Sequence, residues 1–203
     1  MTQKTEKSQK THDSLNLDLM KLEHTEELLK TCLKPHPKPT SKKLIVNPKA
    51  ELKIRIAMKH AKDFEIMWFG EIVINKKGSY ILKDVHFPPQ INRKTLVETD
   101  DEKFPRWFFE RFTKKNKHRD IRLQGHTHPY FGTRPSGIDL KHAVTFLEDA
   151  GDYFIQMILS NNNEPTCRLY TNEGYQPVSI IWNYTLKIKK ILLEVMHIES
   201  NKT

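Results

Sequence analysis

The alternation of hydrophobic and polar residues over 44–182 predicts a series of strands and helices. Runs rich in β-branched and aromatic residues predict strands, while apolar residues spaced three and four apart predict helices. Asn47 followed by Pro48 is typical of a helix start. This mixture of elements predicts an α/β (α+β) domain whose central sheet is flanked by helices. We expect strands at 44–47, 65–74, 79–87, 121–126, 153–160, 166–171 and 177–182, and helices at 48–62, 104–115 and 137–150.

The two ends of the chain differ from this central part. Leucines between positions 15 and 33 share one face of a predicted helix, and three prolines within 34–43 end that helix and form an extended linker. The leucine face either docks on the domain, which is the most ordinary interpretation, or mediates oligomerisation, or binds a partner. We therefore divide the chain into a tail, amphipathic helix and linker (1–43), a main domain (44–182) and a C-terminal helix and tail (183–203).

The composition limits the cellular setting. The two cysteines, Cys32 and Cys167, are far apart and form no CxxC pair, so a cysteine-based zinc knuckle or a disulfide framework is excluded. No apolar run is long enough to cross a bilayer, and the polar start of the chain does not resemble a secretory signal. The sequence predicts a cytoplasmic protein with no membrane partner.

The charge is strongly basic, with 34 Lys and Arg residues against 25 Asp and Glu residues and a net charge of +9. Most of this excess is spread along the chain, and only 111–122 is locally dense in Lys and Arg. A solvated helix end followed by a loop is the ordinary interpretation of that cluster. Because no RRM, KH or zinc-finger pattern accompanies it, we do not expect a nucleic-acid partner.

Candidate metal ligands lie in the segment GHTHPYFGTRPSGID, residues 125–139. His126 and His128 are two apart on a predicted strand, so they project from the same face, and Asp139 falls in the first turn of the next helix. Two neutral imidazoles and one carboxylate are the ligands of a catalytic zinc site whose fourth position is open. We therefore predict one Zn²⁺ per chain.

A hydrolase also needs a general base, and the strand at 65–74 offers two candidates. Glu65 and Glu71 are six residues apart and would face the same way on a regular strand. The position of Glu65 at the strand start favours it, but both candidates stay open on geometry. Ser136 has two interpretations as well, because Ser136-x-x-Asp139 is typical of a helix cap and also fits a catalytic hydroxyl; the two roles are compatible.

Other metal motifs fit this segment less well. An HxHxDH motif needs an aspartate and a histidine directly after Pro129, where Tyr130 and Phe131 stand. The HExxH motif and the deaminase pair HxE with PCxxC are absent. An oxygenase with two histidines and one carboxylate stays formally open, but it leaves the serine and the upstream glutamate unexplained.

The pattern H-x-H-x7-S-x2-D with an upstream glutamate resembles the JAB/MPN/Mov34 (JAMM) metalloproteases, and most closely their prokaryotic and phage members. The resemblance spans 44–182. It implies a mixed, mostly antiparallel central sheet flanked by helices, in the cytidine-deaminase-like JAB/MPN architecture. It also implies zinc ligands at His126, His128 and Asp139, and Glu65 rather than Glu71 as base and proton shuttle. Ser136 would form a hydrogen bond to the oxyanion or to the zinc-bound water.

The function implied by this resemblance is hydrolysis of a peptide or isopeptide bond, with Glu65 assisting attack by a zinc-activated water. The expected partner is a protein or peptide substrate, with a ubiquitin-like or sulfur-carrier C-terminus among the candidates. The added loop of eukaryotic ubiquitin-chain enzymes is absent, since 147–152 leads straight into a strand. The alternative is a non-catalytic JAB-like scaffold that binds partners through the N-terminal helix and the basic surface.

Overall fold

The computed structural model describes residues 30–31, 34–36, 41–161 and 164–183. The expected leucine helix and the expected C-terminal helix lie almost wholly outside these residues. The strands are β1 (Lys42–Val46), β2 (Met67–Ile74), β3 (Tyr80–His86), β4 (Gln90–Asn92), β5 (Val97–Thr99), β6 (Ile121–Thr127), β7 (Tyr153–Leu159), β8 (Thr166–Thr171) and β9 (Gly174–Trp182). The α-helices are α2 (Pro48–Ala61), α3 (Phe104–Arg111) and α4 (Gly137–Ala150), and short 3-10 helices occupy Thr113–Lys115 and His118–Asp120.

Most of the predicted elements form close to their expected bounds. The Asn47 side chain accepts a hydrogen bond from the Lys49 amide at 3.0 Å, and Pro48 is the first residue of α2, as the sequence predicts. Helix α4 has the predicted bounds. Two differences matter for the site: Glu65 lies just before strand β2 instead of within it, and 88–101, to which the sequence assigned no element, contains the β4–β5 hairpin.

The predicted architecture, a helix-flanked sheet of the cytidine-deaminase-like JAB/MPN type, is wrong. The described strands close into a seven-stranded barrel in the order β1-β3-β2-β6-β7-β8-β9. Closure occurs because β1 pairs in parallel with both β3 and β9, with Leu44 opposite Tyr80 on one side and Ile180 on the other. These pairings join strands far apart in the sequence, and a one-dimensional pattern of hydrophobic residues does not specify them.

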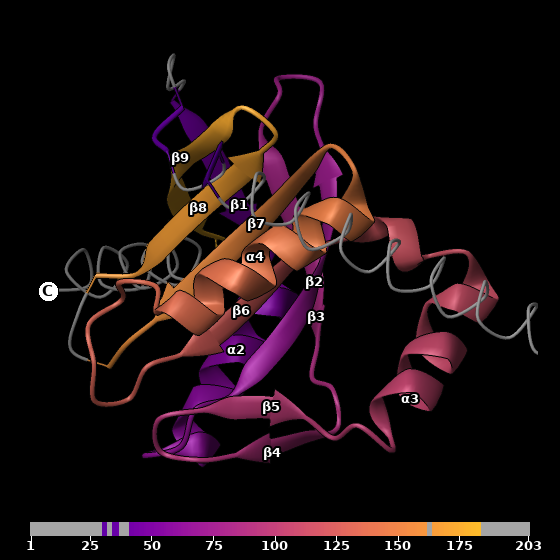
Figure 1. Ribbon diagram of the computed structural model, residues 1–203, viewed down its shortest axis with the longest axis vertical. Coiled ribbons are helices and arrows are strands. Elements are labelled where there is room, and N and C mark those ends of the chain that lie inside the picture. The colour runs from indigo at the N-terminus through magenta and orange to yellow at the C-terminus, as the bar shows by residue number, and fades with distance from the viewer. Residues whose placement is uncertain (1–29, 32–33, 37–40, 162–163, 184–203) are drawn as a thin grey trace, which may run out of the picture.

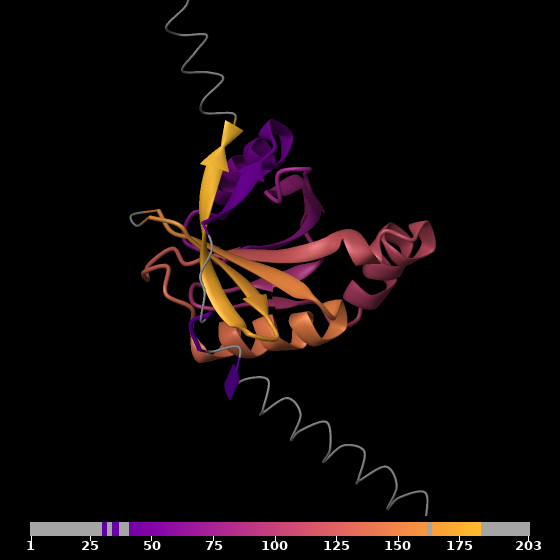
Figure 2. The same ribbon diagram turned by 90° about the horizontal axis from the view of Figure 1, so that it is seen from above.

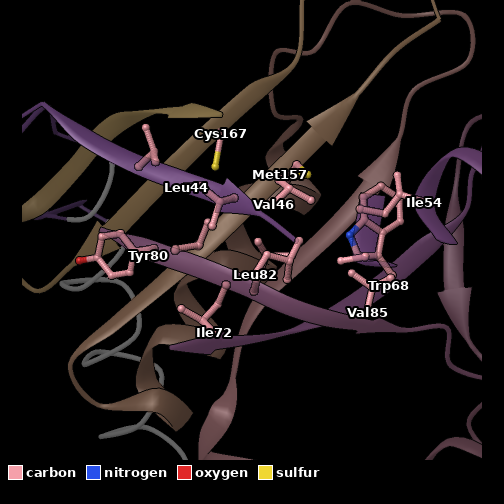
Figure 3. Packing of buried hydrophobic residues seen from close by; sticks show 14 of the residues in the cluster. Leu44, Val46, Ile54, Trp68, Ile72, Tyr80, Leu82, Val85, Met157 and Cys167 are labelled. Atoms are coloured by element: carbon pink, nitrogen blue, oxygen red, sulfur yellow. The ribbon is translucent and has the colours of Figure 1, made fainter. Parts of the chain in front are cut away.

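Helices α2 and α4 lie on opposite sides of the strands (Figures 1 and 2). Alternate buried residues of β2, β7 and β8 enter different apolar clusters. The larger cluster joins Ala50 and Ile54 of α2 to barrel residues that include Leu82 and Met157 (Figure 3). A second cluster joins Ala143, Val144 and Leu147 of α4 to strands β7 and β8. The face of the barrel beneath α4 is the face that carries the candidate site.

The linker residues 34–36 lie against the end of the barrel. The His36 amide donates to the Tyr175 carbonyl at 2.7 Å, and the Tyr175 amide donates to the Lys34 carbonyl at 3.0 Å. This part of the predicted linker therefore pairs with strand β9. None of the helices among the described residues has the length and apolar character needed to cross a membrane.

Candidate metal centre

Strand β6 holds both histidines beneath α4. It lies between β2 and β7, with His126 opposite Met67 on one side and Ile158 on the other. Leu123 of β6 points into the barrel, so alternation places Gln124 and His126 on the side of α4. His126 is 2% exposed and His128 is 7% exposed. The two imidazoles are therefore held by a central strand and are largely removed from water.

Gly125, between Gln124 and His126, is required for this placement. It lies opposite Trp68 of β2, whose indole is fully buried against the strand. A Cβ atom at position 125 would overlap the Trp68 ring. Trp68 is thus a core residue that fixes β6.

Helix α4 brings in the third residue through its first turn. The Ser136 hydroxyl accepts a hydrogen bond from the Asp139 amide at 3.2 Å, and the Asp139 Oδ2 atom accepts one from the Ser136 amide at 2.7 Å. This reciprocal capping box confirms the capping interpretation of Ser136. It also orients the Asp139 carboxylate toward β6. Ser136 itself is exposed at the mouth of the site.

Three potential ligand atoms converge at this point. His126 Nε2 lies 3.0 Å from His128 Nε2 and 3.1 Å from Asp139 Oδ1, and His128 Nε2 lies 3.6 Å from Asp139 Oδ2. One donor atom from each of the three residues lies within 4.8 Å of the others. This group could hold a metal ion.

The hydrogen bond on the far side of His128 strengthens that conclusion. His128 Nδ1 lies 2.9 Å from the Gly132 carbonyl, which can only accept, so Nδ1 carries the proton. In the neutral ring, Nε2 therefore presents its lone pair to His126 Nε2 and to Asp139. This contact is favourable when His126 Nε2 carries the proton of its neutral ring, or when a metal ion takes the place of that proton and both nitrogens act as ligands.

The electrostatics of the three residues reflect the same convergence. Burial alone would raise the pKa of Asp139, but its hydrogen bonds to His126 and His128 outweigh burial and hold the pKa well below its usual range. Burial alone would lower the pKa of His128, but Asp139 and the Gly132 carbonyl outweigh burial and raise it. The carboxylate is thus anionic and attracts a cation to the site.

Glu65 is held next to this group by pairing between β2 and β6. The Ile66 amide donates to the Thr127 hydroxyl at 3.0 Å, and the Thr127 amide donates to the Ile66 carbonyl at 3.0 Å. The antiparallel register that pairs Met67 with His126 brings Glu65 to the level of His128. Glu65 is 5% exposed. Burial raises its pKa to about 7, while His128 opposes that rise and Asp139 adds to it.

Glu71 lies elsewhere, so the structure separates the two candidate bases. Met67 and Phe69 share one apolar cluster on the outer face of β2, and Glu65 and Glu71 fall on that same face by alternation, as the six-residue spacing predicts. Six residues of strand nevertheless span about 20 Å. Glu71 is hydrogen-bonded to His86 at 2.8 Å and does not line the cavity that contains the two histidines.

A cavity of about 420 Å³ contains all five residues that the sequence singled out. Its floor includes Gln124, and its walls include Leu96 and Val97 of the β4–β5 hairpin and His142 of α4. Among the described residues, the buried atoms without a hydrogen-bond partner include Gln124 Oε1 and His126 Nδ1. The residues brought together here are Glu65, His126, His128, Ser136 and Asp139.

Hydrogen bonds anchor the loop between β6 and α4 to residues 160–166. The Thr133 hydroxyl donates to the Glu164 carbonyl at 2.8 Å, and the Thr166 hydroxyl donates to Thr133 Oγ1 at 2.8 Å. The Ser160 hydroxyl donates to the Phe131 carbonyl at 3.2 Å. The Gly132 carbonyl is therefore held where it meets His128.

Sequence reasoning missed two residues that support the site. Thr127, between the two histidines, accepts a hydrogen bond from the amide of Ile66, the residue that follows Glu65. Gln156 of β7 is 1% exposed; its Nε2 donates to the Asp139 carbonyl at 2.8 Å, and its Oε1 accepts from the Tyr170 hydroxyl at 3.2 Å. The signal for Gln156 was a lone amide in the apolar strand YFIQMIL. This network holds the first turn of α4 against the barrel.

Comparisons with known proteins add no assignment, because no family model matches the chain and no curated protein matches it. The interpretation of the site therefore rests on its own geometry and chemistry.

Proposed function

We propose that this protein is a zinc-dependent hydrolase that cleaves a peptide or isopeptide bond. The observation that carries the proposal is the convergence of His126 Nε2, His128 Nε2 and an Asp139 carboxylate oxygen in one cavity with Glu65 and Ser136. A structural metal site would not require a second carboxyl group, here Glu65 with its raised pKa, beside the ligands. The spacing of these five residues resembles the JAMM motif, which supports the peptidase class over other hydrolases.

The donor set fits zinc. Two imidazole nitrogens and one carboxylate oxygen are three protein ligands of the kind found in catalytic zinc sites, which leave one coordination position open. Calcium and magnesium prefer sites made wholly of oxygen atoms, so this set disfavours them. A zinc ion held here would polarise a substrate carbonyl and lower the pKa of a bound water from about 15.7 to about 7.

Glu65 takes the role of general base in this proposal. Its pKa of about 7 places the carboxyl close to the range in which a side chain both accepts and returns a proton at neutral pH. A bound cation lowers that pKa, which favours the ionised, proton-accepting form. Glu65 removes the proton from the attacking water and delivers it to the leaving amine.

Ser136 and the capping box have separable parts in the reaction. The Ser136 oxygen accepts the Asp139 amide proton, and its own hydroxyl proton is left to donate toward the cavity. A hydroxyl donor at the mouth of the site stabilises the oxyanion that forms when the carbonyl is attacked. The cap and the oxyanion contact therefore coexist in one residue.

The test compares two Glu→Gln variants that lie on the same face of β2. Purified protein is assayed on a fluorogenic peptide library and on amides of ubiquitin-like C-terminal tails, before and after removal and restoration of zinc. We expect Glu65→Gln to retain zinc and to lose about 10²- to 10⁴-fold in kcat. Glu71→Gln, outside the cavity, is the matched control and stays within a few-fold of the parent protein.

The outcomes separate the parts of the proposal. Hydrolysis that survives zinc removal contradicts a metal-dependent reaction, and full activity in Glu65→Gln contradicts the assignment of the base. Zinc binding with no hydrolysis of any amide in these panels supports a binding scaffold instead.

A further inference from the structure

A second pocket, which we call the basic pocket, lies away from the metal centre. It has a volume of about 360 Å³ and lies between the start of α2, strand β3 and the segment that follows α3. None of the residues that line it also lines the metal cavity. Its cationic residues come from three separate regions of the chain: Lys49, Lys83, Arg111, Lys115 and Lys117.

The two carboxylates in the basic pocket are already engaged. Asp84 accepts hydrogen bonds from Lys49 at 3.0 Å and from Lys53 at 2.6 Å. Burial raises the pKa of Asp84, but these two lysines outweigh it and lower the pKa to about 2, so the carboxylate stays ionised and paired. Glu71 accepts from the buried His86 ring. The cationic side chains that line the pocket nevertheless outnumber its two carboxylates by five to two.

His86 fixes the position of the pocket's arginine. Arg111 Nε donates to His86 Nδ1 at 2.8 Å, which leaves His86 Nε2 to carry the ring proton toward Glu71 at 2.8 Å. Burial lowers the pKa of His86, so the ring is neutral and can accept from Arg111. The guanidinium is thus anchored through Nε, and its terminal amino groups have no acceptor within the described part of the chain.

Three lysines of the pocket, like the terminal amino groups of Arg111, have no carboxylate partner among the described residues. Lys83, Lys115 and Lys117 are exposed, and no carboxylate among the described residues lies within ion-pair distance of them. Cations gathered around a hollow repel one another, so the arrangement costs free energy unless an anion shares the site. The charges come from separate segments around one open hollow and do not form a stripe along a helix, which favours a small ligand over an extended polyanion.

We propose that the basic pocket binds a small phosphate-bearing ligand. An arginine held through Nε presents its two terminal amino groups as a fork suited to phosphate oxygens, and the surrounding lysines supply point charges for the remaining oxygens. A lone carboxylate has too few oxygens for one arginine and three lysines. This binding site is independent of the proposed hydrolase reaction.

The test is calorimetric titration of the full-length protein with inorganic pyrophosphate at constant ionic strength, with orthophosphate and sulfate as weaker comparison anions. We expect saturable binding of one pyrophosphate per chain. The double variant Lys83→Gln/Lys115→Gln removes two charges from the pocket and weakens binding about tenfold or more. The matched control, Lys76→Gln/Lys77→Gln, removes two exposed charges from the β2–β3 turn and leaves the affinity unchanged.

A further arm excludes binding at the metal centre, because pyrophosphate also coordinates metals. The His128→Ala variant keeps the basic pocket intact and retains full affinity. The Arg111→Lys variant keeps the charge, loses the fork and its anchor on His86, and binds more weakly than the parent protein.

Three results overturn the proposal: the absence of saturable binding, an equal loss of affinity in both double-lysine variants, and a loss of binding in His128→Ala. An oligonucleotide that binds without competition from pyrophosphate also contradicts it, since the basic surface would then serve an extended polyanion.

Discussion

Two buried histidine–carboxylate clusters lie along the outer face of β2, and they differ in what surrounds them. At Glu71, both nitrogens of His86 have a protein partner, because Arg111 donates to one and Glu71 accepts from the other. At the start of β2, the Nε2 atoms of His126 and His128 face each other and Asp139, with no cationic side chain between them. The same residue types thus form a closed polar network in one place and an open ligand set in the other.

This comparison shows why the presence of histidine and carboxylate does not itself define a metal site. Arg111 fills the position at His86 that a cation would otherwise take. At the candidate metal centre the corresponding partner of His128 is a backbone carbonyl, which orients the ring and directs Nε2 toward His126 and Asp139. The hydrogen bond on Nδ1 of His86 and of His128 therefore distinguishes the two clusters.

The largest expected effect on stability concerns Glu65 in the metal-free protein. Its pKa is about 7 in the folded chain against 4.5 in the reference state, so folding favours the protonated form. This contribution is fully present below pH 4.5 and is lost as the pH rises through 7. Glu65→Gln should therefore match the parent protein at low pH and exceed its free energy of unfolding by up to about 3 kcal/mol at pH 8.

Chemical denaturation across pH 4 to 8, after metal removal, measures this difference. The exposed Glu98→Gln variant, which carries the same type of substitution, serves as the control. A Glu65→Gln difference that is independent of pH would contradict a raised pKa for this buried carboxyl group.

The next effect concerns the strand that carries the histidines. In Gly125→Ala the new methyl group overlaps the buried Trp68 indole, and relief of that contact must displace β2 or β6. We expect a loss of about 1–3 kcal/mol in the free energy of unfolding, together with weaker metal binding. Gly132→Ala, where a Cβ atom meets nothing within 4 Å, is the control. Equal stabilities for the two variants would show that the Gly125–Trp68 contact does not fix β6.

A smaller effect, on metal affinity, should follow from loss of the Gln156 side-chain amide, which lies beneath α4. Gln156→Leu removes the hydrogen bonds to the Asp139 carbonyl and the Tyr170 hydroxyl. Groups that orient metal ligands typically contribute about 10- to 100-fold in metal affinity, and we expect a loss in that range. Competition with a chromophoric chelator measures it. Tyr170→Phe removes only the outer bond of the pair, so a loss as large as that of Gln156→Leu would refute a direct role for Gln156 at Asp139.

The parts of the site that the sequence predicts are those encoded locally. Asn47-Pro48 and Ser136-x-x-Asp139 each specify a helix start through contacts within a few residues, and both form as expected. The spacing of His126 and His128 on a strand likewise brings their rings together. Strand alternation also places Glu65 and Glu71 on one face of β2.

The remaining features depend on contacts between distant segments. The barrel closes because β1 pairs with both β3 and β9, and no local sequence pattern encodes these pairings. For this reason the expected central sheet was wrong. The three-residue strands β4 and β5 are too short to give a periodic signal. The function of Gln156 depends on α4 packing across β7, and the choice between Glu65 and Glu71 depends on where β6 ends.

Zinc content per chain tests the central claim most directly, and the two histidine clusters supply the comparison. Parent protein, His128→Ala and His86→Gln are loaded with zinc, desalted and analysed by elemental mass spectrometry, with circular dichroism to verify folding. The account predicts about one zinc per chain in the parent protein and in His86→Gln, and a nearly complete loss in folded His128→Ala. Zinc retained at one per chain in His128→Ala, or lost in folded His86→Gln, would contradict it.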